Sequence, residues 1–272
     1  MKESSAFQTN GFVALAIIIA IAGLGIWLGL PLVAISNTNS WENLGPTEIL
    51  GALLVVLSLA GVFGLVAIEP NQAYVLVFFG SYIGTAREPG FWWVNPLTAK
   101  LPISLRVRNF NSDKLKVNDA RGNPIEIAAV VVWRAIDTAK ALFDVDDYEE
   151  FVAIQSETAI RALAIRYAYD TNEENSPSLR GSPQEVAGVL QEEVQERLEI
   201  AGVEVLESRI SYLAYAPEIA QVMLRRQQAE AIIAARRQII EGALSMVEMT
   251  LNRLSDRDTL VLDDSTKAAM VN

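Results

Sequence analysis

The sequence predicts an α+β protein in three parts: an N-terminal transmembrane helical hairpin, a domain that combines an antiparallel sheet with helices, and a long C-terminal helix. Three observations predict this order. Two charge-free apolar runs come first, alternating apolar and polar residues with turn signals follow, and a long helical pattern begins at Pro217. We place the boundaries at residues 1–11 for an N-terminal segment, 12–68 for the hairpin, 69–215 for the domain, 216–255 for the long helix and 256–272 for a C-terminal segment.

The two apolar runs extend from Phe12 to Ile35 and from Ile49 to Ile68, with a short polar connection at residues 36–48. At about 1.5 Å per helical residue they reach roughly 36 and 30 Å, which matches a hydrocarbon layer of about 30 Å. A signal peptide would have a shorter apolar run and a basic start, so we do not favour one here. A pair of buried core helices is also disfavoured, because a domain this small could hardly cover so many apolar residues. A first helix that enters the leaflet without crossing remains an alternative.

Positive charge near the ends of the spans predicts the orientation. The connection at residues 36–48 contains no Lys or Arg, whereas Lys2 and Arg87 lie on the other side of the hairpin. We therefore expect the connection outside and the large domain in the cytoplasm, at a bacterial-type inner or plasma membrane. Trp41 is expected to be an interfacial anchor.

The composition excludes several classes of function. The chain has 22 Lys and Arg against 33 Asp and Glu, a net charge of −11, which argues against binding to nucleic acid. It contains no Cys and no His, which removes thiol catalysis, Ser-His-Asp triads, Cys/His zinc sites and haem ligation by His. We expect no cofactor and no metal.

The first part of the domain is predicted to be β-rich. Tyr74 to Phe79 is apolar on both faces and predicts a covered strand, and residues 84–96 are predicted to form a loop. Residues 103–136 alternate around a turn at residues 118–124 and predict an antiparallel hairpin. The loop carries three consecutive aromatic residues, which either pack under the sheet or contact lipid headgroups; the residues of this predicted membrane contact are Phe91, Trp92 and Trp93.

A dense acidic run at residues 144–150 lacks the glycine and the distal glutamate of a calcium-binding loop. Asp147 followed by Glu150 predicts a capping box and a helix to about Tyr169. The residues expected on one face of that helix are Phe151, Ile154, Thr158, Ala162 and Ile165.

A second helix is predicted from Ser182, with proline next and glutamate at the third position, to about Ala201, where Gly202 ends it. Residues 203–214 are predicted to return to strand.

The long helix from Pro217 to about Leu254 carries a heptad seam in its second half. At roughly 57 Å it would overreach a domain of ordinary size, so we favour packing against neighbouring copies over folding back on its own domain. The predicted oligomer interface consists of Ile233, Arg237, Ile240, Leu244, Val247, Leu251 and Leu254.

Several segments together resemble one family. They are Ile68–Val75, Phe79–Thr85, Pro89–Pro96, Gly122–Ile125, Asp144–Tyr148, Ala201–Val205 and Ala216–Ala220. The chain resembles the SPFH or band 7 family of stomatins, prohibitins and flotillins over about residues 68–255. The resemblance implies an SPFH domain on the membrane surface followed by a long helix. It also implies many copies in a ring or cage, and a non-enzymatic scaffold that organises a membrane microdomain and restrains membrane proteases or channels.

The residues bear on three candidate functions. An oligomeric membrane scaffold is favoured by the hairpin, the seamed helix and the missing catalytic side chains. A pore or channel component would need helices from several copies, and neither apolar run carries the charge that marks an ion path. A Ser/Lys hydrolase needs no His, but residues 69–272 contain neither Gly-x-Ser-x-Gly nor Ser-x-x-Lys. The expected partners are the lipid bilayer, further copies of the chain, and a membrane protease or channel.

Overall fold

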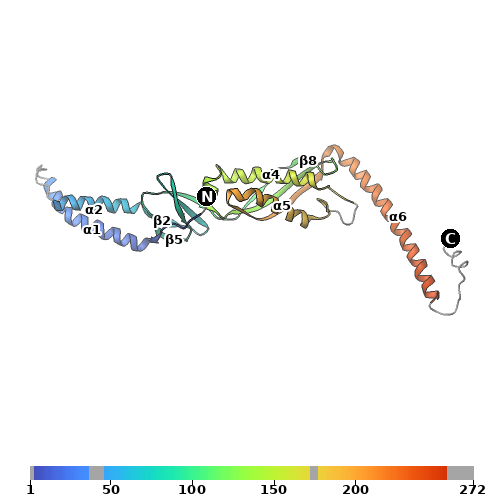
Figure 1. Cartoon of the computed structure of the whole chain (residues 1–272), viewed down its shortest axis with the longest axis horizontal. Helices are drawn as coiled ribbons and strands as arrows, with labels where there is room; N and C mark the ends of the chain where they lie inside the picture. The colour runs from blue at the N-terminus through green and yellow to red at the C-terminus, as the bar shows by residue number, and fades with distance from the viewer. Residues whose placement is uncertain (1–2, 37–45, 172–176, 256–272) are drawn as a thin grey trace. The chain divides into compact units, whose positions relative to one another are not determined.

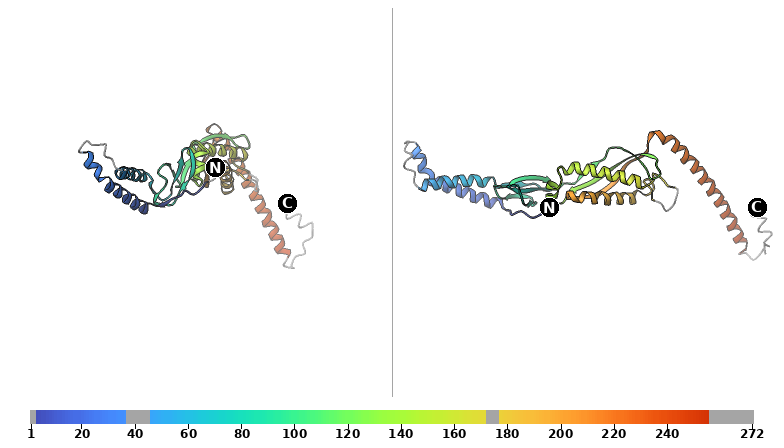
Figure 2. Two further views of the ribbon diagram at one scale, coloured as in Figure 1. Left: turned by 60° about the vertical axis from the view of Figure 1, so that its left-hand side comes forward. Right: turned by 45° about the horizontal axis from the view of Figure 1, so that its top comes forward.

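Two apolar helices, α1 (Gly11–Ser36) and α2 (Pro46–Val62), pack side by side near the start of the chain (Figure 1). The computed structural model describes residues 3–36, 46–171 and 177–255. The chain divides into two compact units between Leu213 and Ala214: the first holds the apolar helices and the sheets, and the second holds α6 (Pro217–Ser255). This arrangement confirms the predicted α+β class with its long C-terminal helix. Figure 2 shows the same elements from two further directions.

The two apolar helices are antiparallel, and glycines let their backbones touch. A Cβ atom added at Gly51 of α2 would lie 2.7 Å from the nitrogen of Gly29 and 2.8 Å from the oxygen of Gly25, both on α1. Small residues spaced four apart allow this close approach between apolar helices. At the other end of the pair, Gly61 lies against the side chain of Ile18.

The second apolar run is not one helix, so its prediction as a span from Ile49 to Ile68 is wrong at its end. Helix α2 stops at Val62, and Leu65–Ile68 forms strand β2. The N–H groups of Phe63 and Gly64 donate to the carbonyls three residues earlier, which tightens and ends the last turn. Gly64 then fits under the Trp93 indole, where a Cβ would meet its nitrogen at 2.4 Å. Trp41 and the connection around it lie outside the described residues.

A small antiparallel sheet lies at the base of the helix pair. Its order is β1 (Thr9–Asn10), β5 (Gly90–Trp93) and β2, so that the strand before α1 and the strand after α2 flank the same central strand. Asn10 and Val66 both pair with Trp92. The segment at residues 84–96 is therefore not the predicted loop throughout, because residues 84–86 complete β4 (Ser81–Ala86) and residues 90–93 form β5.

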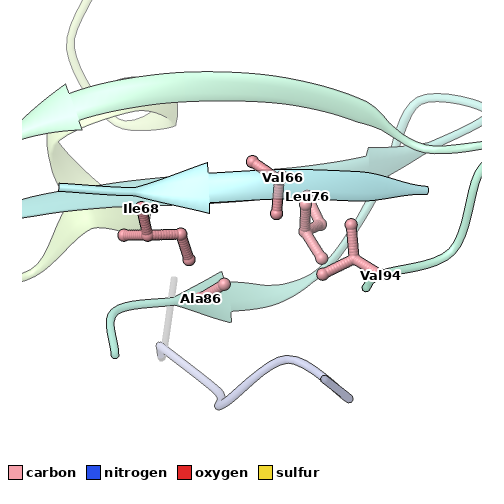
Figure 3. Packing of buried hydrophobic residues seen from close by; sticks show 5 residues of the cluster. All are labelled: Val66, Ile68, Leu76, Ala86 and Val94. Atoms are coloured by element: carbon pink, nitrogen blue, oxygen red, sulfur yellow. The ribbon is translucent and has the colours of Figure 1, made fainter. Parts of the chain in front are cut away.

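The next sheet has the order β4, β3 (Gln72–Phe78) and β6 (Ala99–Ser104). The predicted covered strand at residues 74–79 is confirmed as the central strand β3 up to Phe78, whereas Phe79 lies in the turn that follows. Side chains from both sheets form one apolar cluster (Figure 3), whose members are Val66, Ile68, Leu76, Ala86 and Val94.

A further sheet contains β7 (Arg108–Asn111), β8 (Leu115–Asn118), β9 (Pro124–Ala135) and β10 (Val203–Tyr215). Strands β7 and β8 both pair antiparallel with β9, so the predicted hairpin is correct from residue 108 onward. Its first part is wrong, because residues 99–104 form β6 and pair with β3 instead.

Helices α3 (Thr138–Phe143), α4 (Tyr148–Arg166) and α5 (Pro183–Leu198) complete the first unit. Asp147 caps α4 by accepting from the N–H groups of Glu149 and Glu150, as predicted. The predicted face of α4 is wrong: Ile154 and Ile165 are exposed. The face that packs on the core includes a serine, so it shows no continuous apolar pattern in the sequence. The residues of that face are Val152, Ser156, Ala159, Ile160, Leu163 and Ala164.

The predicted limits of the second helix are confirmed. Pro183 is its first residue, although the Ser182 side chain makes no capping hydrogen bond. The short 3₁₀ helix η2 (Glu199–Ala201) follows, and Gly202 ends it with φ of 63°. That left-handed conformation favours glycine, and a Cβ there would also lie 2.5 Å from the carbonyl oxygen of Asp137.

Asp119 fastens the β8–β9 turn to the end of α4. The residue is 5 % exposed, and its carboxylate accepts hydrogen bonds from the backbone N–H groups of Arg121, Asn123 and Tyr169 at 2.8 to 3.1 Å. Burial alone would raise the pKa of Asp119, but these bonds and one from the Asn123 side chain outweigh it and hold the pKa below its usual value.

Replacing Asp119 by Asn should lower the free energy of unfolding by about 2 kcal/mol, because hydrogen bonds to an ionised acceptor are lost. The folded-state pKa is depressed, so the stabilisation is present above the unfolded value of 3.8 and is lost as pH falls through the folded value. Thermal melts of the solubilised protein should therefore differ at pH 7 and converge below pH 4. A constant difference across that range would contradict this role.

Gly51→Leu should force α1 and α2 apart, since its side chain would overlap the backbone of Gly29. Overpacking of this kind costs about 1 to 3 kcal/mol, and we expect a lower melting temperature by tryptophan fluorescence. Gly23→Leu is the matched control, because a Cβ at Gly23 has no neighbour within 4 Å among the described residues. Equal melting temperatures for the two variants would refute the glycine contact.

Candidate membrane-anchoring and assembly surfaces

The aromatic residues predicted to contact the membrane lie at the base of the helix pair. The rings of Phe91 and Phe12 pack with centroids 5.1 Å apart. The Trp93 indole N–H donates to the carbonyl of Gly61 at 2.9 Å, and the Trp92 indole N–H donates to the carbonyl of Glu88 at 2.9 Å. All three predicted rings are half-buried, so each packs on protein and keeps an accessible side. Their contact with lipid stays a prediction.

Three exposed apolar residues near this base were missed. Phe63 at the end of α2 is 74 % exposed, Phe79 is 88 % exposed, and Leu97 is 69 % exposed. Phe79 also has φ of 45°, an uncommon conformation for a bulky residue, in the turn that joins β3 to β4. The signal in the sequence is an aromatic pair before Gly80, which we assigned to the strand.

Lys100 links the sheet to the end of α2. Its ammonium group donates to the carbonyl of Phe63, where a cation complements the partial negative charge of a helix C-terminus. Burial lowers the pKa of Lys100. Because Val77 pairs with Ala99, the β3–β4 turn that carries Phe79 lies at this same end of the sheet.

The segment before α1 attaches to the body of the first unit. The carboxylate of Glu3 forms an ion pair with Arg87 at 2.5 Å and accepts from the N–H of Thr138 at the start of α3 at 3.1 Å. The carbonyl of Ser4 accepts from the N–H of Thr85. The segment before α1 and the strand after α2 are therefore both attached to the sheets of the first unit.

Helix α6 presents a broad apolar surface. Of the predicted interface, Ile233, Ile240 and Leu244 are 60, 61 and 54 % exposed, and Val247 is 37 % exposed. Arg237 is also exposed, whereas the side chains of Leu251 and Leu254 lie outside those described. A second apolar stripe, spaced by seven residues, was missed; it consists of Ile232, Ile239 and Met246.

The charged residues of α6 contribute little to this surface on their own. Arg226 and Glu230 form an exposed ion pair one turn apart at 2.7 Å, and exposed pairs of this kind contribute little to stability because water and salt screen them. The apolar stripes are therefore the feature of α6 that calls for a partner.

One helix in the described part of the chain, over Gly11–Gly29, is long and apolar enough to cross a membrane, and α2 is shorter with 17 residues. An uncharacterised protein of Archaeoglobus fulgidus is 26% identical over 112 residues, which cover 41% of this chain and 45% of that protein. The match thus spans less than half of that relative. The profile of the SPFH domain / Band 7 family matches residues 66–243, from β2 into α6 and more than half of the chain. The apolar N-terminal helix, which lies before the matched residues, fits a membrane protein. Because the profile covers more than half of its residues, this chain belongs to the SPFH domain / Band 7 family.

Proposed function

We propose that this chain is an oligomeric membrane scaffold. The α1–α2 hairpin anchors each copy in the bilayer, the SPFH domain lies on the cytoplasmic side, and copies of α6 pack side by side in a ring or cage. The enclosed membrane patch is a microdomain in which membrane proteases or channels are held. The observation that carries this proposal is the apolar surface that α6 leaves exposed.

The two stripes of α6 favour an array over a simple pair of helices. A pair needs one seam on each helix, whereas a helix in a closed ring has a neighbour on each side. The stripe of Ile232, Ile239 and Met246 lies beside the seam of Ile233 and Ile240, so the apolar arc is wide enough for two contacts.

The energetics agree with many copies rather than two. Burying an aliphatic side chain contributes about 1.5 to 3 kcal/mol, so the exposed aliphatic residues of both stripes supply roughly 10 kcal/mol per contact. Association costs about 4 to 15 kcal/mol in lost freedom. One contact is therefore marginal, and attachment to a shared membrane together with a second neighbour makes the assembly favourable.

The shape of the helix pair supports anchoring with both ends on one side. Strands β1 and β2 bring the start of α1 and the end of α2 to the same strand β5. Helix α2 is roughly 26 Å long, a few ångströms shorter than a hydrocarbon layer of about 30 Å. Local thinning of the bilayer accommodates such a difference at small cost.

Leu244→Asp should dissociate the assembly, because it places a charge in an apolar contact at a cost of several kcal/mol per subunit. We expect native mass or size-exclusion measurements on detergent-extracted protein to show smaller species. Ser245→Asp adds the same charge to the neighbouring position, outside both stripes, and should leave the size unchanged. Elution of Leu244→Asp at the parental size would exclude this contact.

The orientation can be tested with single cysteines, because the chain contains none. A membrane-impermeant maleimide should label Asn39→Cys in intact cells and should label Asn252→Cys only after lysis. The reverse pattern would place the SPFH domain outside, and labelling of both only after lysis would mean that the hairpin does not cross the bilayer.

A further inference from the structure

A cavity of about 580 Å³ lies between α1 and α2 at the base of the hairpin. Its walls come from the first half of α1, the last turns of α2 and the end of β5. Almost all of the side chains that line it along the helices are apolar, and the main ones are Val13, Ile17, Ile18, Ile21, Leu57 and Ala60.

The cavity exists because the spacing of the two helices changes along the pair. At Gly25, Gly29 and Gly51 the backbones are in direct contact. Toward the base, the Ile18 side chain stands between the helices and lies against Gly61. The space between them is therefore a groove that is closed near the glycines and ends at its base against Thr9, Asn10 and Trp93.

The end of the groove at the sheet is lined by Thr9, Asn10 and Trp93. The Thr9 hydroxyl and the Trp93 indole N–H already donate to the carbonyls of Trp93 and Gly61. The Asn10 side-chain oxygen accepts from the N–H of Phe12 at 3.0 Å, which leaves the amide NH₂ of Asn10 able to donate to an oxygen of a headgroup.

The depth of the groove matches one leaflet of a bilayer. From Asn10 to Ile21 the groove follows α1 for roughly 16 Å, about half of a hydrocarbon layer of about 30 Å. A molecule with a polar head at the base and an apolar tail of one leaflet's length would satisfy both ends.

We propose that this groove binds one acyl chain of a membrane phospholipid from the leaflet next to the SPFH domain, with the headgroup at Asn10. The proposal rests on the hairpin anchoring the chain in a bilayer. A transmembrane helix of a neighbouring copy is the rival occupant, but it would bring an apolar surface against the Asn10 amide, whereas a headgroup would bring oxygen atoms that accept from it.

The experiment uses the full chain in vesicles of phosphatidylethanolamine and phosphatidylglycerol, doped with a phosphatidylcholine that carries a diazirine in its acyl chain. After irradiation, modified residues are mapped by mass spectrometry. We expect crosslinks to concentrate on Ile17, Ile18 and Leu57 over Ile19, which lies at similar depth, is 62 % exposed and does not line the groove.

Two variants fill the groove from opposite walls: Ala14→Phe on α1 and Ala60→Phe on α2. Both should lose most crosslinks at the groove residues and keep those at Ile19. Ala16→Phe adds the same ring to an exposed position of α1 outside the groove and should leave the parental pattern intact.

Crosslinks spread evenly over groove residues and Ile19 would overturn the proposal, as would groove residues modified less than Ile19, the pattern expected if a neighbouring helix filled the space. An alkaline carbonate wash separates this failure from failure of the anchor. If the parental chain stays in the membrane pellet while its crosslinks are even, only the groove is excluded; if carbonate releases it, the hairpin anchor fails as well.

Discussion

Pairing of β1 and β2 with the two edges of β5 is the constraint on which the first unit depends. Strand β1 continues directly into α1, and β2 follows α2 after two residues, so the register on β5 fixes where α1 begins and where α2 ends. The hydrogen bond from Trp93 to Gly61 and the packing of Phe91 on Phe12 then fix the helices at their base. Backbone pairing in a small sheet thereby determines the geometry of the two apolar helices at their base.

The sequence was most informative where local signals act alone. The cap at Asp147, the start at Pro183 and the left-handed Gly202 are decided by a few neighbouring residues, and the structure agrees with each. The long helix from Pro217 follows from composition and periodicity in the same way.

The pairing of strands that are distant in the sequence could not be predicted from local patterns. Leu65–Ile68 is as apolar as the helix before it, and only its pairing with β5 makes it a strand. Residues 99–104 alternate like the strands after them, yet they pair with β3 instead of β9. In the candidate surfaces, the aromatic cluster was found by composition. Phe79 was assigned to the strand before Gly80, and Leu97 was missed because a single apolar residue in a turn carries no periodic signal. The second stripe of α6 was not predicted, because Ile232 and Ile239 directly precede the heptad residues Ile233 and Ile240 and were not considered as a separate pattern.

The contact between Glu3 and the start of α3 has a consequence for biogenesis. The partners of Glu3 lie 84 residues away at Arg87 and 135 residues away at Thr138, beyond both apolar helices. These contacts can therefore form only after both helices have been synthesised. In a chain whose helix pair has not formed, both edges of β5 stay unpaired, and unpaired strand edges are templates for aggregation with other chains.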